Sequence, residues 1–158
     1  MQRVLVTGGS GFIGSAVIRH LLASTALDIV NVDKLTYASS PATLEAAQRS
    51  PRYHFEKTDI CDGSALSRIF KQYDPDAVLH LAAESHVDRS IEGAAPFIET
   101  NIVGTYVLVE CALRHWQRLD ERRRSTFRFH HVSTDEVFGS LSLSEMNGFD
   151  ESSNYNPS

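Results

Sequence analysis

Long apolar runs are absent from this 158-residue chain. No window approaches the ~18 apolar residues that a membrane-spanning helix requires, and the opening MQRVLVTGG lacks the apolar segment of a secretory signal. Cysteine is also scarce: Cys61 and Cys111 lie far apart and match no metal or redox spacing. We therefore expect a cytoplasmic protein with no membrane partner, whose thiols are buried or half-buried in a reducing compartment.

Positive charge is in short supply as well. The chain has 15 Lys and Arg against 20 Asp and Glu, and this net charge of -5 argues against a nucleic-acid partner. Its one basic cluster, residues 118–125, is better explained by a solvated helix end than by a phosphate site. The seven histidines offer no metal-ligand pattern: His130 and His131 point to opposite faces of an expected strand, and His80 and His86 fit no ligand spacing. We assign no metal.

Apolar segments typical of strands alternate with segments of helical periodicity. The composition, 42% hydrophobic and 22% charged, suits one buried core in a single domain or in part of a larger protein. Because several strands are apolar enough to be covered on both faces, we predict an α/β fold with a Rossmann-type doubly wound parallel sheet, incomplete at the C-terminus. The predicted strands are 4–6, 27–33, 53–59, 76–82 and 126–133, and the predicted helices are 12–24, 41–49, 63–74 and 91–121, the last as one helix or a broken pair.

A glycine-rich stretch, TGGSGFIG, separates the first strand from the first helix. Gly8, Gly11 and Gly14 have a GxxGxxG spacing, which permits a tight turn, brings backbone close to a pyrophosphate and lets helix and strand pack closely. The helix N-terminus would offer unpaired amides to the phosphates. A plain tight turn needs the same glycines, so the motif alone leaves both interpretations open.

The ends of the second and third strands carry acids. Asp33 follows Gly14 by 19 positions, close to the roughly 20 at which an acid binds the ribose hydroxyls of NAD. A 2′-phosphate would face this carboxylate, so the pattern favours NAD over NADP, with Lys34 as the opposing feature. Asp59 and Ile60 are placed to meet the adenine, although a surface acid at a strand end is the alternative for Asp59.

After the fifth strand, the stretch FRFHHVSTDEVFGS places Thr134, Asp135 and Glu136 in succession. Acids after a strand are most often solvated turn residues. Two neighbouring carboxylates also suit acid–base catalysis when their environments give them opposite protonation states. The residues alone do not decide between the two.

Five stretches together resemble the extended short-chain dehydrogenase/reductase family, and within it the dTDP-glucose 4,6-dehydratases: VTGGSGFIG, NVDKLTYA, LAAESHVDRSI, FIETNIVGTYVLVE and FHHVSTDEVFG. The resemblance runs from Arg3 to Gly139. Related sugar-nucleotide epimerases carry small residues where Asp135 and Glu136 stand, so this pair is the most specific element. The resemblance implies an NAD-binding Rossmann domain at 1–139 and a loop at 140–158 that leads to an absent catalytic helix and substrate domain.

The implied activity is that of a lyase in nucleotide-sugar metabolism, acting on dTDP-glucose. NAD takes hydride from sugar carbon 4, a base removes the carbon 5 proton while an acid protonates the departing carbon 6 hydroxyl, and the hydride returns to carbon 6. The product is dTDP-4-keto-6-deoxy-glucose. By resemblance Asp135 is the acid, Glu136 is the base and Thr134 binds the 4-hydroxyl.

The family resemblance and the glycine turn together indicate which residues bind cofactor and substrate. The NAD-binding residues are expected to be Gly8, Gly11, Phe12, Ile13, Gly14, Asp33, Lys34, Leu35, Thr36, Asp59, Ile60, Leu81, Ala82, Ala83, Ser85 and Thr100. Substrate is expected to contact Glu84, Ser85, His86 and Thr134, with Arg89 as a further candidate. Capping or packing would equally explain Thr100 and Ser85, and a polar loop after a strand needs no ligand.

The chain departs from the family pattern at two points. Phe138 replaces a tyrosine, which removes one hydroxyl. We also interpret the chain as lacking the YxxxK motif whose tyrosine deprotonates the 4-hydroxyl, and Tyr155 is not assigned that role. We therefore expect the 158-residue chain to be inactive alone and to form a homodimer when complete. A 4,6-dehydratase for another nucleotide sugar and a non-catalytic NAD-binding module are the alternatives.

Overall fold

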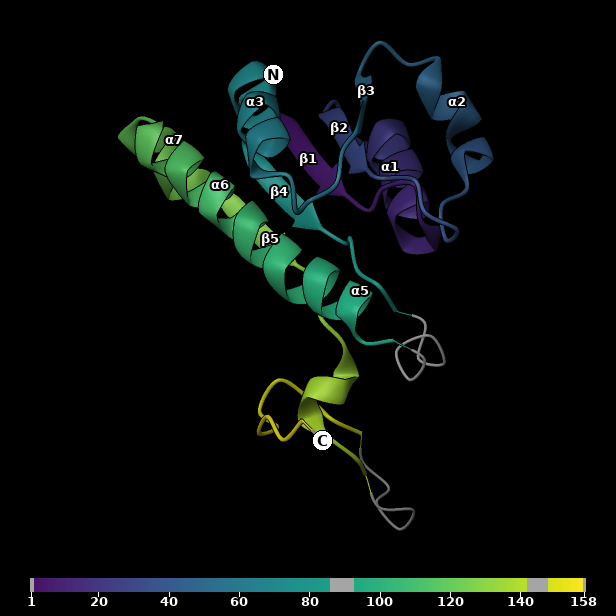
Figure 1. Ribbon diagram of the computed structural model, residues 1–158. Helices are drawn as coiled ribbons and strands as arrows, with labels where there is room; N and C mark the ends of the chain where they lie inside the picture. Colours follow the sequence, from purple (N-terminus) through teal and green to yellow (C-terminus); the bar gives the residue numbers. More distant parts are fainter. Residues whose placement is uncertain (1, 86–92, 142–147, 158) are drawn as a thin grey trace.

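The computed structural model describes residues 2–85, 93–141 and 148–157, which form a parallel sheet with helices on both faces (Figure 1). All neighbouring strands are parallel, in the order β3-β2-β1-β4-β5. This arrangement confirms the predicted Rossmann-type doubly wound sheet. The strands are β1 (Arg3–Thr7), β2 (Asp28–Asp33), β3 (Tyr53–Lys57), β4 (Ala77–His80) and β5 (Arg128–His131).

Helices cover the two faces of the sheet in two groups. One group contains α1 (Phe12–Ser24), the 3-10 turn η1 (Pro41–Leu44) and α2 (Glu45–Gln48), and the other contains α3 (Gly63–Tyr73) and α6 (Thr105–Arg118). Alternation along β1 feeds both cores, because Val4 and Val6 pack with the first group and Leu5 packs with the second. The sheet is thereby fixed between two apolar layers, and the carboxyl ends of its strands share one edge.

Several element boundaries differ from prediction. β4 ends at His80, before the predicted 82, because the backbone beyond it turns into the loop that carries Leu81 to Ser85. The predicted helix at 91–121 begins outside the described residues; within them it comprises α5 (Ala95–Phe97), the π-helical η2 (Ile98–Gly104) and α6. A separate helix, α7 (Glu121–Thr126), takes the residue at which the fifth strand was predicted to start.

The basic cluster at 118–125 is more than a solvated helix end. Arg123, in α7, forms salt bridges of 2.6 Å with Asp74 and 2.9 Å with Asp76. These contacts fasten α7 to the turn between α3 and β4. The interpretation as a solvated helix end is therefore wrong for Arg123, because its guanidinium group is paired with two carboxylates. The sequence did not reveal this pairing, because the two partners lie far from Arg123 along the chain.

Beyond β5 the chain leaves the layered part of the molecule (Figure 1). A short 3-10 helix, η3 (Asp135–Phe138), is followed by backbone without helix or strand in the described residues 140, 141 and 148–157. Phe138 stacks on Phe149 with ring centroids 5.2 Å apart and also contacts Tyr155. These aromatic contacts hold the two described parts of the segment together.

Cysteines and acids form no metal centre in the described part of the chain. No three His, Cys, Asp or Glu side chains there are grouped to hold an ion. Cys111 is buried and Cys61 is half-buried, and both thiols are free, as expected. None of the described helices is long and apolar enough to cross a membrane.

Candidate functional site

The glycine turn between β1 and α1 is held by backbone at close range. Gly8 has a φ of +69°, and a β-carbon there would lie 2.7 Å from the Cα of Ala82. A β-carbon on Gly14 would lie 2.2 Å from the Gly8 carbonyl oxygen, whereas one on Gly11 would meet only that oxygen, at 3.3 Å. The turn itself therefore requires Gly8 and Gly14. A phosphate site needs separate support.

The first turn of α1 gives that support. Its N-cap is Gly11, which has no side chain to accept hydrogen bonds from the exposed amides, and the turn contains no acidic residue. Amides at a helix N-terminus carry partial positive charge and lack intrahelical partners. They remain available at the end of a 13-residue helix. This end of α1 suits an anionic group such as a phosphate.

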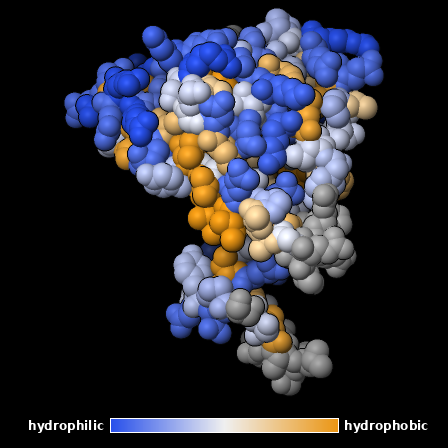
Figure 2. Space-filling view, in the orientation of Figure 1, coloured by the Kyte–Doolittle hydropathy of each residue, from blue (hydrophilic) through white to orange (hydrophobic). Residues whose placement is uncertain are grey.

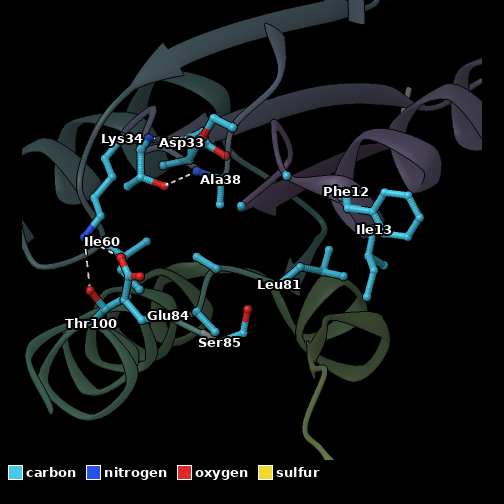
Figure 3. A pocket seen from close by; sticks show the side chains of 18 of the residues that line it. Phe12, Ile13, Asp33, Lys34, Ala38, Ile60, Leu81, Glu84, Ser85 and Thr100 are labelled. Carbon is cyan, nitrogen blue, oxygen red and sulfur yellow. Dashed lines mark hydrogen bonds and ion pairs between the residues drawn. The ribbon is translucent and has the colours of Figure 1, made fainter. Parts of the chain in front are cut away.

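A cavity of about 330 Å³ opens where the carboxyl ends of β1, β2 and β4 meet (Figure 3). Ligands of doubly wound sheets bind at this edge. The glycine turn forms one wall, and the loops after β2 and β4, the segment after β3 and Thr100 of η2 form the rest. The lining residues are Gly8, Gly11, Phe12, Ile13, Gly14, Val32, Asp33, Lys34, Thr36, Ala38, Ser39, Thr58, Ile60, Leu81, Ala82, Ala83, Glu84, Ser85 and Thr100.

Two of the sixteen residues predicted to bind NAD do not line this cavity, namely Leu35 and Asp59. Leu35 has a φ of +60° in the loop after β2, and Asp59 lies 3.5 Å from the ammonium group of cavity-lining Lys34. Glu84 and Ser85, predicted to contact substrate, line this same cavity, and His86 and Arg89 lie outside the described residues. Whether the lining residues bind a cofactor stays a prediction.

Sequence reasoning missed four lining residues: Val32, Ala38, Ser39 and Thr58. Val32 and Thr58 each precede a predicted residue directly, so the strand ends were a usable signal. For Ser39 the sequence signal was weaker, namely a hydroxyl six positions after Asp33. In the structure this hydroxyl lies 3.0 Å from a carboxylate oxygen of Asp33. Ala38 had none, because a small apolar side chain in a loop carries no chemical signature.

Asp33 joins the loops around the cavity. One carboxylate oxygen accepts hydrogen bonds from the Leu35 amide at 2.8 Å and the Ser39 hydroxyl at 3.0 Å, and the other accepts one from the Ser10 amide at 2.9 Å. A carboxylate oxygen can accept two hydrogen bonds, so the second oxygen keeps capacity for a hydroxyl donor. Its negative charge at the cavity wall opposes a second anion there.

Lys34 closes one end of the cavity (Figure 3). Its ammonium group donates a 3.0 Å hydrogen bond to the Thr100 hydroxyl and lies 3.5 Å from Asp59 and 3.9 Å from Glu84. With two carboxylates beside it, Lys34 has its charge balanced locally. It therefore adds little net positive charge beside Asp33.

His80, at the end of β4, is buried behind the cavity wall. Its Nδ1 lies 2.7 Å from the Thr7 hydroxyl and its Nε2 lies 2.9 Å from the Thr105 hydroxyl. Burial lowers the pKa of His80 from its ordinary 6.5 to about 4, with a smaller contribution from the nearby His131. The neutral ring links β1 and α6, and Thr7 accepts a 3.4 Å hydrogen bond from the amide of cavity-lining Ala82.

Thr134, Asp135 and Glu136 lie at the carboxyl end of β5, beyond the cavity lining. Thr134 caps η3, because its hydroxyl accepts a 3.3 Å hydrogen bond from the Glu136 amide. All three side chains are exposed. β5 pairs with β4, so the acids share the sheet edge of the cavity without entering it. The geometry is compatible with a solvated turn and with acid–base catalysis, and the assigned roles stay predictions.

The interpretation that the chain lacks the YxxxK motif is wrong for the spacing itself, because YxxxK occurs at Tyr53 and Lys57. Both residues belong to strand β3, where positions four apart lie about 13 Å from each other. The Tyr53 hydroxyl accepts a 2.9 Å hydrogen bond from Asn31, and burial raises the pKa of Tyr53. Neither residue lines the cavity. A lysine this far away cannot lower the pKa of the tyrosine, so this pair is not the family's redox pair.

Comparison with known proteins shows the family and the fold of the chain. A sequence profile described as GDP-mannose 4,6 dehydratase matches residues 5–158. The dTDP-glucose 4,6-dehydratase of Haemophilus influenzae is 60% identical over 158 residues, 100% of this chain and 46% of that protein. A dTDP-glucose 4,6-dehydratase from Streptomyces venezuelae, solved with NAD and TYD bound, is 43% identical, with a TM-score of 0.83 over 99% of this chain and 46% of that one.

A second solved dTDP-glucose 4,6-dehydratase, from Bacillus anthracis and in complex with NAD, is 32% identical. Its TM-score is 0.82, and the match covers 100% of this chain and 45% of that one. The chain thus spans just under half the length of the relatives that it matches.

Proposed function

The chain belongs to the family described as GDP-mannose 4,6 dehydratase, and from that premise we propose that it provides the NAD-binding part of a dTDP-glucose 4,6-dehydratase, a lyase. The 60% identity over the whole chain favours dTDP-glucose as the substrate. One structural observation carries the proposal: the glycine turn, the uncapped end of α1 and the Asp33 carboxylate all face one cavity.

The residues of the cavity fit a dinucleotide. The amides of the α1 first turn would hold the pyrophosphate, and Asp33 would accept hydrogen bonds from the adenosine ribose. Ile60 would pack on the adenine, while the loop that begins at Leu81 and the hydroxyl of Ser85 would border the nicotinamide ribose. NAD, when bound, would take up hydride from the sugar and return it. Asp33 would exclude the extra phosphate of NADP by charge.

The elimination step is assigned to the η3 residues. Glu136 would remove the proton from carbon 5, Asp135 would protonate the hydroxyl leaving carbon 6, and Thr134 would bind the 4-hydroxyl. The two carboxylates begin a short helix capped by Thr134, which fixes their backbone. Sugar bound beside β4 and β5 would lie within reach of both acids and the cavity, because these strands are neighbours.

The chain does not provide the tyrosine–lysine pair that would deprotonate the sugar 4-hydroxyl for hydride transfer. The YxxxK spacing at Tyr53 and Lys57 lies in β3 and outside the cavity. We infer that the 158-residue chain alone does not turn over dTDP-glucose, even where it binds NAD. Its product would appear only in the full-length protein.

A stripe of exposed apolar side chains supports a homodimer. Residues three or four positions apart share one helix face. Figure 2 shows an apolar band on this side of the molecule. The exposed large apolar and aromatic side chains of η2 and α6 include Ile98, Ile102, Tyr106, Val109, Leu113 and Trp116. We place this face against a second copy of the full-length protein. The two free thiols support the cytoplasm as its compartment.

The decisive experiment incubates the full-length protein with NAD⁺ and dTDP-glucose and follows loss of water by mass spectrometry. We expect the 4-keto-6-deoxy product from dTDP-glucose at a far higher kcat/KM than from GDP-mannose or UDP-glucose. A preference for another nucleotide sugar would overturn the substrate assignment. NAD binding without product from any of the three would show a non-catalytic module.

A further inference from the structure

Asn101, on η2, holds the backbone of Glu84 from both sides. The side-chain oxygen of Asn101 accepts a 2.9 Å hydrogen bond from the Glu84 amide, and its side-chain nitrogen donates one of 2.9 Å to the Glu84 carbonyl. A strand neighbour would pair with the backbone in this same two-bond manner. Asn101 thus fixes a loop that has no helix or strand structure of its own.

The π-helical turn of η2 places two adjacent side chains on this region. Thr100 is buried and accepts the hydrogen bond from Lys34, while Asn101 bonds Glu84. π-helical turns are rare and occur frequently at functional sites. The turn therefore connects the loop after β4 and the residue after β2 to one rigid helix.

Glu84 in turn reaches the loop after β2. One carboxylate oxygen accepts a 3.2 Å hydrogen bond from the Tyr37 hydroxyl, and the other lies 3.9 Å from the Lys34 ammonium. The Glu84 side chain is only 14% exposed, although it points toward an open cavity. Figure 3 shows Lys34, Thr100 and Glu84 together at the same end of the cavity. We call Glu84, Lys34 and Tyr37 the clasp.

We propose that Asn101 is a positioning residue for this clasp and that the clasp controls how long a dinucleotide stays in the cavity. This inference rests on the proposed NAD-binding function. It also gives Glu84 a different role from the sugar contact expected from the sequence, because its carboxylate is engaged with the loop after β2. The bound dinucleotide would lie between the clasp and the glycine turn.

Release then requires the loops after β2 and β4 to separate. Separation breaks the ion pair between Glu84 and Lys34 and the hydrogen bond from Tyr37. Because the clasp is closed without a ligand, it raises the barrier for entry of the dinucleotide as well as for its release. Salt screens a partly exposed ion pair. Dissociation should therefore be faster at high salt.

The test measures release of bound NADH from the full-length protein by fluorescence, with excess NAD⁺ as the chase. Asn101→Ala removes two hydrogen bonds and should speed release about tenfold or more. Glu84→Gln keeps the backbone bonds and removes the charge, and should speed release about threefold. Gln48→Ala, on an exposed position of α2 away from the cavity, is the matched control and should release NADH at the parent rate.

A double variant separates positioning from a general structural effect. If Asn101 acts through Glu84, then Asn101→Ala should add less in the Glu84→Gln background than in the parent, and raising NaCl from about 0.05 to about 0.5 M should speed release only where Glu84 is present. Additive effects, or parent rates in both single variants, would overturn the inference. A parent that fails to bind NADH would overturn the proposed function itself. If Asn101→Ala does not fold, Asn101→Asp takes its place in this comparison, because it keeps the acceptor for the Glu84 amide and loses the donor to the Glu84 carbonyl.

Discussion

The carboxylate of Asp33, at the end of β2, accepts a 2.9 Å hydrogen bond from the amide of Ser10 in the glycine turn after β1. This contact joins neighbouring strands at the point where both border the cavity. It also commits the carboxylate to the turn before any ligand binds. Asp33 therefore has a structural role and, in the proposed function, a binding role.

Asp33→Asn should separate these two roles. The amide keeps much of the shape and loses the negative charge that repels a 2′-phosphate, so the ratio of NADH to NADPH affinity should fall by about tenfold. Fluorescence titration of the full-length protein with both dinucleotides measures the ratio. Glu151→Gln, which removes an exposed acid elsewhere, is the control and should leave the ratio unchanged. An unchanged ratio in Asp33→Asn would remove the argument for NAD from this residue.

Gly14→Ala should destabilise the turn. The new β-carbon would sit 2.2 Å from the Gly8 oxygen and 2.7 Å from the Gly9 Cα, and backbone atoms cannot move aside as a flexible side chain would. We expect a loss of about 1–3 kcal/mol in the free energy of unfolding, as for overpacked cores. Chemical denaturation measures this loss. Gly148→Ala meets no atom within 4 Å and should be nearly neutral, and equal effects of the two changes would contradict the geometry.

His80 should make stability depend on pH. Its pKa is about 4 in the folded protein and its ordinary value is 6.5, so the unfolded chain takes up the proton first as pH falls. The neutral ring therefore makes its full contribution to the free energy of unfolding above pH 6.5. This contribution is lost progressively toward pH 4, and the loss is about 2 kcal/mol at pH 5. Denaturation curves at pH 7.5 and pH 5 should differ more for the parent than for His80→Gln. Equal pH dependence in both proteins would argue against a buried neutral histidine.

Glu136→Gln tests the acid–base assignment in the full-length protein. Because the side chain is exposed, stability should change by less than about 0.5 kcal/mol. Product formation should fall by about 10²–10⁴-fold. Exchange of the carbon 5 proton with solvent deuterium should stop, while the first hydride transfer continues. Exchange at the parent rate would disprove the role of Glu136 as the base.

The local sequence pattern predicted the fold and the glycine turn that forms one wall of the cavity. The continuous apolar run Val4, Leu5 and Val6 predicted a strand covered on both faces, and the structure divides these residues between two cores. Boundaries were less predictable, since α7 is fastened by Arg123 to two acids distant in sequence. The YxxxK spacing at Tyr53 and Lys57 shows the reverse problem, because a motif has meaning only in the secondary structure that brings its residues together.

Periodicity and backbone sterics act within short stretches of chain, so the strand–turn–helix order, the glycines of the turn and the acid at the end of β2 could be predicted without coordinates. The pairing of Lys34 with Asp59 and Glu84 could not be predicted in this way. Nor could the burial of His80 between two hydroxyls or the hydrogen bonds from Asn101 to Glu84. Each of these contacts joins residues from different strands and helices. Their partners are set by how the layers pack, and no local pattern contains that information.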